Sequence, residues 1–343
     1  MFKLAINRGR IAQGFYPQNS RTMIWVDHNG VADFLGRPGL PTGFEPISGE
    51  FLEEAQKLEA KRIYIQRSWA LGDTLMAIPV LREIKKLGWD CYLRASDQYA
   101  SIMPYLDIPF QSMKKNTTIG DVGLVADWML EQDHTDEERG ALHRVHIYAK
   151  AAGVKMPPAS EIDWSMDISK LPEIPALVGE KYIVLQTQGA NTRKCLPLQA
   201  LEKIAVRLNA AGIKVCHVGP PEEKIASSIP VKHFASKLSL PQLFSLIAGA
   251  ECAVVMDSAP LWITHFTTTP VIAMLGPTAW QQRLSLHPLA PEGVRAIQLE
   301  QRIGCKPCRE KAEACAGRYD CLVKVDTEAL AKTVLECVEE FIR

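Results

Sequence analysis

The sequence predicts an α/β protein with two doubly wound, Rossmann-like domains that face each other across a cleft. In both halves of the chain, short apolar runs bounded by turn-forming residues alternate with segments of helical periodicity, which is typical of parallel sheets covered by helices. The length of 343 residues exceeds one typical domain and suffices for two hydrophobic cores. Residues 156–175 contain four prolines and little periodicity, so we place the linker there. The predicted parts are an N-terminal extension over residues 1–55, one domain over 56–172, a second over 173–325 and a C-terminal helix over 326–343.

The first 55 residues predict an irregular extension packed on the body of the protein. Gly, Pro, Asn and Asp are scattered through this part, and short apolar pieces such as residues 23–26 suit the strands of a hairpin. Aromatic residues distinguish the extension from a disordered tail, which usually lacks them. They are Phe15, Tyr16, Trp25, Phe34 and Phe44.

A β-α-β unit is predicted next. Residues 62–66 alternate in polarity like a strand, residues 74–88 carry apolar side chains at helical spacing, and residues 91–95 suit a second strand. Gly88 ends the helix, since glycine readily adopts the positive φ common at helix C-termini.

Asp73 therefore lies at the first turn of a helix, just beyond the carboxyl end of a strand. As a structural residue, its carboxylate would interact with the helix dipole. As a functional residue, it would be a general base exposed in a cleft. The sequence leaves both interpretations open. Gly72, its neighbour, would let the backbone approach a ligand closely.

Residues 135–153 predict another helix, with Thr135 as its N-cap and Gly153 at its C-terminal end. His143 and His146 lie three residues apart in this segment, as two metal ligands on a helix would. Because no third ligand is near in the sequence, one solvated and one packed histidine are the favoured interpretation.

The second half predicts strands and helices in regular alternation. The expected strands are residues 182–186, 214–218, 253–256 and 271–275, and the expected helices are residues 198–212, 240–250 and 327–343. Asp257 and Ser258 follow the strand 253–256 at the point where another helix starts. In parallel sheets ligands bind beyond the carboxyl ends of strands, and a helix N-terminus favours anions, so an anionic ligand such as a diphosphate is expected there.

Composition narrows the class of protein. Lys plus Arg and Asp plus Glu number 39 each, so the formal net charge is zero, which disfavours nucleic acid as a partner without excluding it.

The N-terminus has no apolar signal-peptide core, and no apolar stretch reaches about 18 residues. We therefore expect a cytoplasmic protein without a membrane-spanning helix; peripheral contact with the inner membrane face and homo-oligomer formation stay open. In that compartment the nine cysteines are expected to be thiols or metal ligands.

From about residue 61 onward the chain resembles glycosyltransferase family 9, the bacterial ADP-heptose-dependent heptosyltransferases with a GT-B fold. Five segments carry the resemblance: LGDTLMAIPVLREIKK, LHRVHIYAKAAGV, QGANTRKCLP, GPPEE and MDSAPLWITHFTTTPVIAMLGPT. The resemblance implies that the first domain holds the acceptor, that the second holds a nucleotide diphosphate-sugar, and that transfer inverts the anomeric centre without a catalytic metal.

The resemblance also assigns roles to residues. Asp73 is similar to the family's general base, with Gly72 beside it on the acceptor side. Lys194 resembles the lysine that contacts the donor diphosphate. The other implied donor-binding residues are Gly189, Thr192, Arg193, Glu222 or its neighbour Glu223, Asp257, Ser258 and Ala259. General-base catalysis and a cationic diphosphate site suit the chemistry of inverting transfer.

Three positions depart from the family pattern. Ala259 replaces a glycine, Trp262 stands where a histidine is expected, and Cys195 replaces a tryptophan. An alanine adds a Cβ where the backbone could need a positive φ. His265, one turn later, either compensates for the missing histidine or is an ordinary helix residue.

Cys305, Cys308, Cys315 and Cys321 follow the spacing C-x2-C-x6-C-x5-C within residues 303–322. Four thiolates suit a closed, tetrahedral structural site for iron or zinc. Free or disulfide-paired cysteines are the alternative. Some members of the resembled family, notably those that act on proteins, carry a similar finger that holds iron.

The sequence thus favours a transferase that moves a sugar, with a heptose as one candidate, from a nucleotide diphosphate-sugar to a glycan or protein hydroxyl. ADP is the favoured nucleotide. The alternative is a degraded family member that serves as a binding or assembly module, because Ala259 and Trp262 depart from the pattern. A Rossmann oxidoreductase is disfavoured, since no G-x-G-x-x-G follows the strands near Ile63 and Tyr182.

Overall fold

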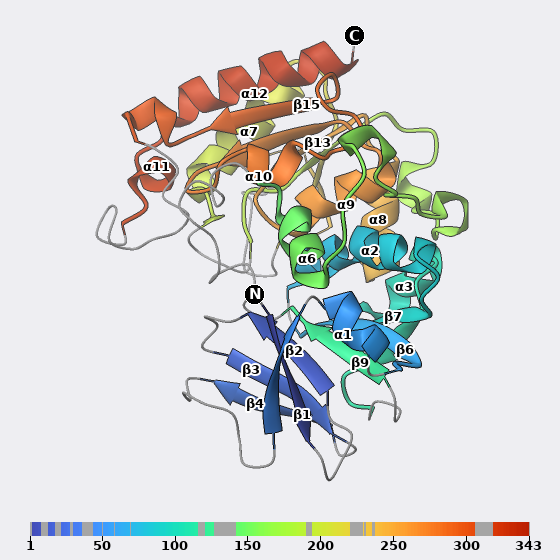
Figure 1. Cartoon of the computed structure of the whole chain (residues 1–343). Coiled ribbons are helices and arrows are strands. Elements are labelled where there is room, and N and C mark those ends of the chain that lie inside the picture. The colour runs from blue at the N-terminus through green and yellow to red at the C-terminus, as the bar shows by residue number, and fades with distance from the viewer. Residues whose placement is uncertain are drawn as a thin grey trace. The chain divides into compact units, whose positions relative to one another are not determined.

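The computed structural model of the chain is drawn in Figure 1. It describes the backbone of residues 2–7, 13–17, 22–27, 30–35 and 44–49, and it describes in more detail residues 51–57, 59–68, 70–115, 121–126, 142–189, 194–219, 229, 231–234, 237–305 and 318–342. The chain divides into two compact units, Met1–Trp164 and Ser165–Arg343. None of the helices in the described ranges combines the length and the apolar character that crossing a membrane requires.

The division between the units lies inside the predicted linker, but earlier than the expected boundary at residue 172. The chain stays packed on the first unit up to Trp164, whose buried ring contacts the His143 ring edge to face at 6.4 Å. One residue earlier, the Asp163 carbonyl accepts a hydrogen bond of 2.8 Å from Arg82. These contacts, which have no periodic signal in the sequence, keep the start of the proline-rich segment in the first unit.

The first unit contains a seven-stranded mixed sheet in the order β5-β1-β2-β9-β6-β7-β8. Its strands are β1 (Phe2–Asn7), β2 (Gln13–Pro17), β5 (Phe44–Gly49), β6 (Arg62–Arg67), β7 (Cys91–Ala95), β8 (Phe110–Ser112) and β9 (Asp121–Val125). The part from β2 to β8 is parallel, whereas β1 runs antiparallel to both of its neighbours. The strands predicted at residues 62–66 and 91–95 are confirmed.

The expectation of an irregular N-terminal extension is wrong at the level of the backbone. Strands β1, β2 and β5 belong to the main sheet, and β3 (Thr22–Asp27) pairs with β4 (Gly30–Leu35) in an antiparallel hairpin, which confirms the hairpin predicted around residues 23–26. Short strands separated by glycine and proline have little periodicity to detect, and their pairing with strands far along the chain is a tertiary effect.

The helices of the first unit are α1 (Phe51–Lys57), α2 (Leu71–Lys86), α3 (Met103–Leu106) and α6 (Arg144–Ala152). The apolar side chains at helical spacing on α2 are fully buried; they are Leu75, Ile78, Leu81 and Ile84. Helix α6 begins later than predicted. Its N-cap is His143, whose ring Nδ1 accepts a hydrogen bond from the Val145 amide at 3.3 Å, and the expected N-cap Thr135 lies outside the described residues.

The second unit contains a six-stranded, fully parallel sheet in the order β12-β11-β10-β13-β14-β15. Its strands are β10 (Ile183–Leu185), β11 (Val215–His217), β12 (Lys232–His233), β13 (Cys252–Met256), β14 (Val271–Leu275) and β15 (Val294–Gln298). All four strands predicted in this half are present. Fully apolar runs made them recognisable, because strands buried on both faces show no alternation.

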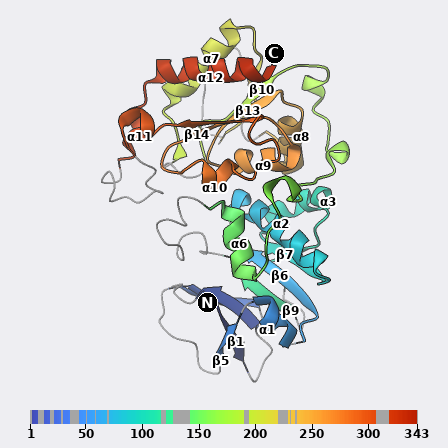
Figure 2. The same ribbon diagram turned by 45° about the horizontal axis from the view of Figure 1, so that its top comes forward.

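Helices cover both faces of this sheet. They are α7 (Leu198–Ala210), α8 (Leu240–Ala248), α9 (Ala259–Thr267), α10 (Gln281–Leu284), α11 (Asp320–Val323) and α12 (Thr327–Ile342). Helices α7 and α12 lie side by side over one face, whereas α8 and α9 lie on the other (Figures 1 and 2). Helix α12, which the sequence predicts, buries Leu330, Val334 and Val338 in the core. Short 3-10 helices are Asp97–Ile102, Ala159–Glu161, Ile168–Lys170, Pro175–Leu177 and Gln301–Ile303.

Candidate functional site

A polar cluster lies where the adjacent parallel strands β10 and β13 end in the second unit. Gln186 follows β10, Asp257 follows β13, and Ser258 precedes α9. Neighbouring parallel strands end at the same edge of the sheet, which brings these three side chains together. This edge is the place where the sequence predicts an anionic ligand.

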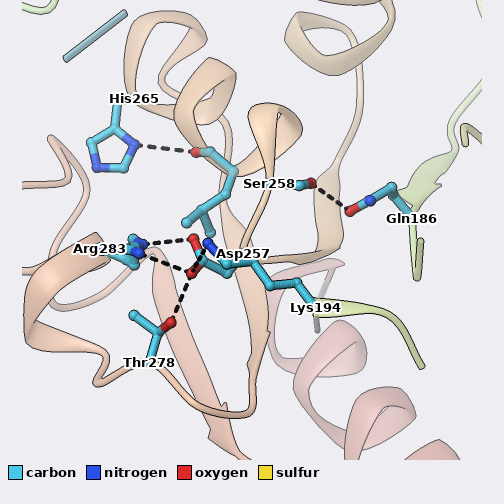
Figure 3. Close-up of polar contacts among 8 residues, drawn as sticks. Gln186, Lys194, Asp257, Ser258, His265, Thr278 and Arg283 are labelled. Carbon is cyan, nitrogen blue, oxygen red and sulfur yellow. Dashed lines mark hydrogen bonds and ion pairs between the residues drawn. The ribbon is translucent and has the colours of Figure 1, made fainter. Parts of the chain in front are cut away.

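Asp257 is the centre of the cluster. Its carboxylate accepts hydrogen bonds from Arg283 Nε at 2.6 Å and Nη2 at 3.0 Å, and from the Thr278 hydroxyl at 2.9 Å, while Lys194 Nζ lies 3.1 Å from Oδ2 (Figure 3). The residue is 6% exposed. Burial by itself would raise the pKa of this carboxyl, but the charges of Arg283 and Lys194, with hydrogen bonds from Arg283 and Thr278, hold the pKa far below its usual range.

Gln186 joins the two strand ends. Its Oε1 accepts hydrogen bonds from the Met256 amide at 3.0 Å and from the Ser258 hydroxyl at 3.1 Å, and its Nε2 donates to the Gln188 carbonyl. The Ser258 hydroxyl is therefore oriented toward β10 and makes no side-chain cap for α9 (Figure 3). This contact fixes the side chain of Ser258, which the resemblance implies to be a donor-binding residue.

The residues that depart from the family pattern fit the structure without strain. Ala259 is the first residue of α9, and it is absent from the positive-φ residues of the described backbone. Trp262 is buried and stacks on His265, with 5.2 Å between ring centroids. The His265 ring Nδ1 lies 3.2 Å from the Leu261 carbonyl oxygen, and burial lowers the pKa of His265 to about 4. His265 thus lies in the interior as a neutral residue.

The segment QGANTRKCLP, residues 188–197, which contains Lys194, is described except for residues 190–193. Gly189 packs against Ser258: a Cβ on this glycine would lie 3.4 Å from the Ser258 Cβ. The Gly189 amide donates a hydrogen bond to Cys195 Sγ at 3.3 Å. Cys195, which stands where the family pattern has a tryptophan, thus joins the two ends of this segment. The other predicted donor-binding residues lie outside the described ranges; they are Thr192, Arg193, Glu222 and Glu223.

Asp73 lies in the first turn of α2 in the first unit, with its side chain 25% exposed. Arg67, at the end of β6, donates from Nη2 to Asp73 Oδ2 and from Nη1 to the Ala126 carbonyl at 3.0 Å. The arginine side chain is 1% exposed, so it is a fixed support for the carboxylate. Gly72 is buried beside it, and Ala70 precedes the helix with a φ of 63°. A positive φ at a non-glycine residue often marks a functional site.

Sequence reasoning missed four residues of these clusters. They are Arg67, Gln186, Thr278 and Arg283. Arg67 and Gln186 occupy the ends of predicted parallel strands, where polar residues after an apolar run are a usable signal. Arg283 has no comparable signal, because it is brought to Asp257 from a short helix beyond β14.

The cysteine finger, residues 303–322 with its four cysteines, is described only at its two ends, residues 303–305 and 318–322. Cys305 is exposed after a 3-10 helix, and Cys321 is buried on α11, where it would lie 3.3 Å from a Cβ on Gly276. Cys308 and Cys315 lie outside the described residues. Within the described ranges no group of three or more His, Cys, Asp or Glu side chains forms a metal site. The donor set of the whole segment, four thiols, nevertheless fits iron or zinc.

Lipopolysaccharide heptosyltransferase 3 of Escherichia coli is 30% identical over 144 residues, which are 39% of this chain and 41% of that protein. The chain thus aligns with less than half the length of this curated relative.

Solved structures that share the fold include two heptosyltransferases of E. coli. The dodecameric, iron-containing heptosyltransferase TibC of enterotoxigenic E. coli, in complex with ADP-D-β-D-heptose, superposes with a TM-score of 0.63 at 15% identity, over 100% of this chain and 92% of TibC. The E. coli heptosyltransferase WaaC with ADP has a TM-score of 0.53 at 15% identity, over 81% of this chain and 98% of WaaC. At such identities the likeness shows the GT-B type of fold alone.

The family model for glycosyltransferase family 9 (heptosyltransferase) matches residues 111–317. This range contains Lys194, Asp257, Ser258 and Arg283. It covers more than half of the chain. The chain therefore belongs to glycosyltransferase family 9, the family of the heptosyltransferases.

Proposed function

We propose that this protein transfers a sugar from a nucleotide diphosphate-sugar to an acceptor hydroxyl, with ADP as the nucleotide and a heptose as the sugar. The observation that carries the proposal is the contact between Lys194 and Asp257 at the carboxyl ends of β10 and β13. Membership of family 9 supports it, as do the similar structures of TibC and WaaC, which were solved with ADP-heptose and with ADP.

In this proposal the second unit binds the donor. Lys194 provides a partly exposed cation beside the N-terminus of α9, whose helix dipole favours a phosphate group. Both features stabilise the negative charge that grows on the diphosphate as the sugar leaves. Because these groups supply the positive charge, the proposed chemistry needs no catalytic metal.

Asp73 acts as the general base. Its carboxylate takes the proton of the acceptor hydroxyl while the acceptor oxygen attacks the anomeric carbon from the face opposite the diphosphate. The bond to the diphosphate oxygen breaks, the electron pair leaves with ADP, and the configuration inverts. Arg67 orients the carboxylate through Oδ2. The acceptor is a glycan or a protein hydroxyl.

The donor site is tested by calorimetric titration with ADP, UDP, GDP and CDP. We expect selective binding of ADP and a loss of at least about tenfold in affinity in Lys194→Ala, since one charge-assisted contact to a phosphate is removed. Lys332→Ala, on an exposed face of α12, is the matched control and should bind like the wild type. If none of the four nucleotides binds at millimolar concentration, the transferase proposal fails and the binding-module alternative takes its place.

The role of Asp73 as general base is tested by a separate substitution. Asp73→Asn should lower kcat by a factor of about 10² to 10⁴, the usual contribution of general-base catalysis, while the Kd for ADP stays unchanged. Asp90→Asn, an exposed carboxylate in the same unit, is the control and should retain full turnover. Full turnover in Asp73→Asn would assign the base to another residue.

We also propose that Cys305, Cys308, Cys315 and Cys321 hold a structural iron or zinc ion. Four thiolates leave no open coordination position, so the ion would stabilise the segment and take no part in transfer. TibC is an iron-containing protein, which favours iron. Elemental analysis of the purified protein should find one equivalent of metal, and Cys305→Ser should reduce it. A metal-free wild-type protein would contradict this assignment.

A further inference from the structure

Two cations contact the single carboxylate of Asp257, but they do so from different surroundings. The Arg283 side chain is 5% exposed and makes a two-point contact, whereas the Lys194 side chain is 20% exposed and approaches one oxygen at 3.1 Å. The planar guanidinium is the better partner for a buried carboxylate. Arg283 is therefore the interior partner of Asp257, and Lys194 is the outer one.

Arg283 is itself held in place by aromatic side chains. Its Cζ lies 5.8 Å from the centroid of the Trp262 ring, and Trp262 stacks on His265. His265 in turn contacts the ring of His287, with 4.6 Å between centroids. Both imidazoles are buried, so the column beneath the guanidinium is neutral and does not repel it.

We propose that Arg283, supported by Trp262, is a positioning residue that balances the charge of Asp257 so that the charge of Lys194 acts on the donor diphosphate. The inference rests on the donor site proposed above. One carboxylate and two cations leave one positive charge among these three groups. Without Arg283, the buried carboxylate would hold Lys194 as its counterion and would also repel the diphosphate.

This role gives a reason for the tryptophan at position 262. The flat indole face is a platform for a guanidinium, which a smaller histidine ring provides less well and a protonated histidine would repel. The departure from the family pattern is thus tied to Arg283, on α10, and the two residues form one supporting pair.

The test compares the affinities for ADP and for adenosine, which lacks the diphosphate, in Arg283→Met, in Arg283→Lys and in the double variant Arg283→Met/Asp257→Asn. Arg283→Met should weaken ADP binding by about tenfold or more, with no change for adenosine, because the charge balance at the phosphate site is lost. Adding Asp257→Asn to Arg283→Met should bring ADP affinity back to within about threefold of the wild type, since Lys194 no longer faces a carboxylate. Arg283→Lys, which keeps the charge but loses the planar two-point contact, should weaken ADP binding less than Arg283→Met does.

A purely structural role gives a different pattern. The double variant would then bind ADP as weakly as Arg283→Met or more weakly, and adenosine affinity would fall as well; either result overturns the inference. Unchanged ADP binding in Arg283→Met also overturns it. If Arg283→Met does not fold, as judged by circular dichroism, Arg283→Gln takes its place because it keeps an N–H donor for Asp257. A wild type that binds neither compound refutes the donor site itself, which distinguishes the two failures.

Discussion

At the scale of single residues, His265 and His287 link the stability of the second unit to pH. Burial lowers the pKa of His265 to about 4, and burial together with the neighbouring His265 lowers the pKa of His287 to about 2. In the unfolded chain both titrate near the usual value of about 6.5. The folded state therefore binds fewer protons below that pH. Stability is complete above about pH 6.5 and is lost progressively as the pH falls.

Each histidine should lower the free energy of unfolding by about 1.4 kcal/mol per pH unit between pH 6.5 and its folded pKa. His265→Phe keeps an aromatic ring against Trp262 and removes one titrating group, so its unfolding free energy should fall less steeply between pH 6.5 and pH 4. Urea titrations at several pH values measure the slopes. Lys332→Ala should reproduce the wild-type slope, and an equal slope in His265→Phe would contradict the assignment.

Part of the site is predictable from the sequence at this scale. Lys194, Asp257 and Ser258 are recognisable from motifs, and the structure brings Lys194 and Asp257 into contact. Arg283 is not, although it makes the closest contacts to Asp257. Its contact depends on where α10 packs after β14, and a pairing of that kind has no local pattern in the chain.

At the scale of elements, the pairing of β6 with β9 depends on one glycine. Tyr64 on β6 is opposite Gly123 on β9, and a Cβ at position 123 would overlap the Tyr64 ring. The ring cannot move easily, because it is fully buried and stacks on Tyr92 at 5.2 Å. The Tyr92 hydroxyl donates to Asp121 at 2.8 Å, which ties the stack back to β9.

Gly123→Ala should therefore lower the free energy of unfolding by about 1–3 kcal/mol, as overpacking of a core usually does. Urea denaturation measures the change. A smaller side chain at position 64 should relieve the overlap. Tyr64→Leu should therefore lower the free energy of unfolding less in the Gly123→Ala background than in the wild type, and this double-mutant cycle is the control. Strictly additive effects would show that the two residues do not compete for space.

Elements with strong local signals are predictable from the sequence. Helix α2 and the strands of the second unit carry helical periodicity or fully apolar runs, whereas β1, β2 and β5 have no such signal. Those three strands are stabilised by partners that are distant in sequence, such as the pairing of β2 with β9, and local patterns do not report such pairing. The same reason explains the late start of α6, where the His143 side chain determines the cap.

At the scale of the whole molecule, the proposed donor and base residues belong to different units. Lys194, Asp257 and Arg283 lie in Ser165–Arg343, whereas Asp73 lies in Met1–Trp164. Each unit has its own sheet and buried side chains, so each is expected to unfold as a separate cooperative unit.

Differential scanning calorimetry should then resolve two unfolding transitions. ADP should raise the midpoint temperature of only one of them. At a free ADP concentration of 100 times Kd, the stabilisation of the donor-binding unit should be about 2.7 kcal/mol. At the same ADP concentration, a tenfold higher Kd in Lys194→Ala should reduce the stabilisation to about 1.4 kcal/mol, and Asp73→Asn should retain the full shift. A single transition that moves as a whole with ADP would show that the units unfold together.

The sheet of the first unit also sets an order of events during synthesis on the ribosome. Strands β1 and β2 are translated first, yet β2 is anchored in the sheet by β9, Asp121–Val125, which emerges much later. Until then the nascent chain carries an unpaired strand edge, the kind of surface that chaperones cover and that neighbouring chains can capture. Strand β2 therefore lacks one of its two neighbours in the sheet until β9 is synthesised, and a ribosome that pauses before β9 prolongs that exposure.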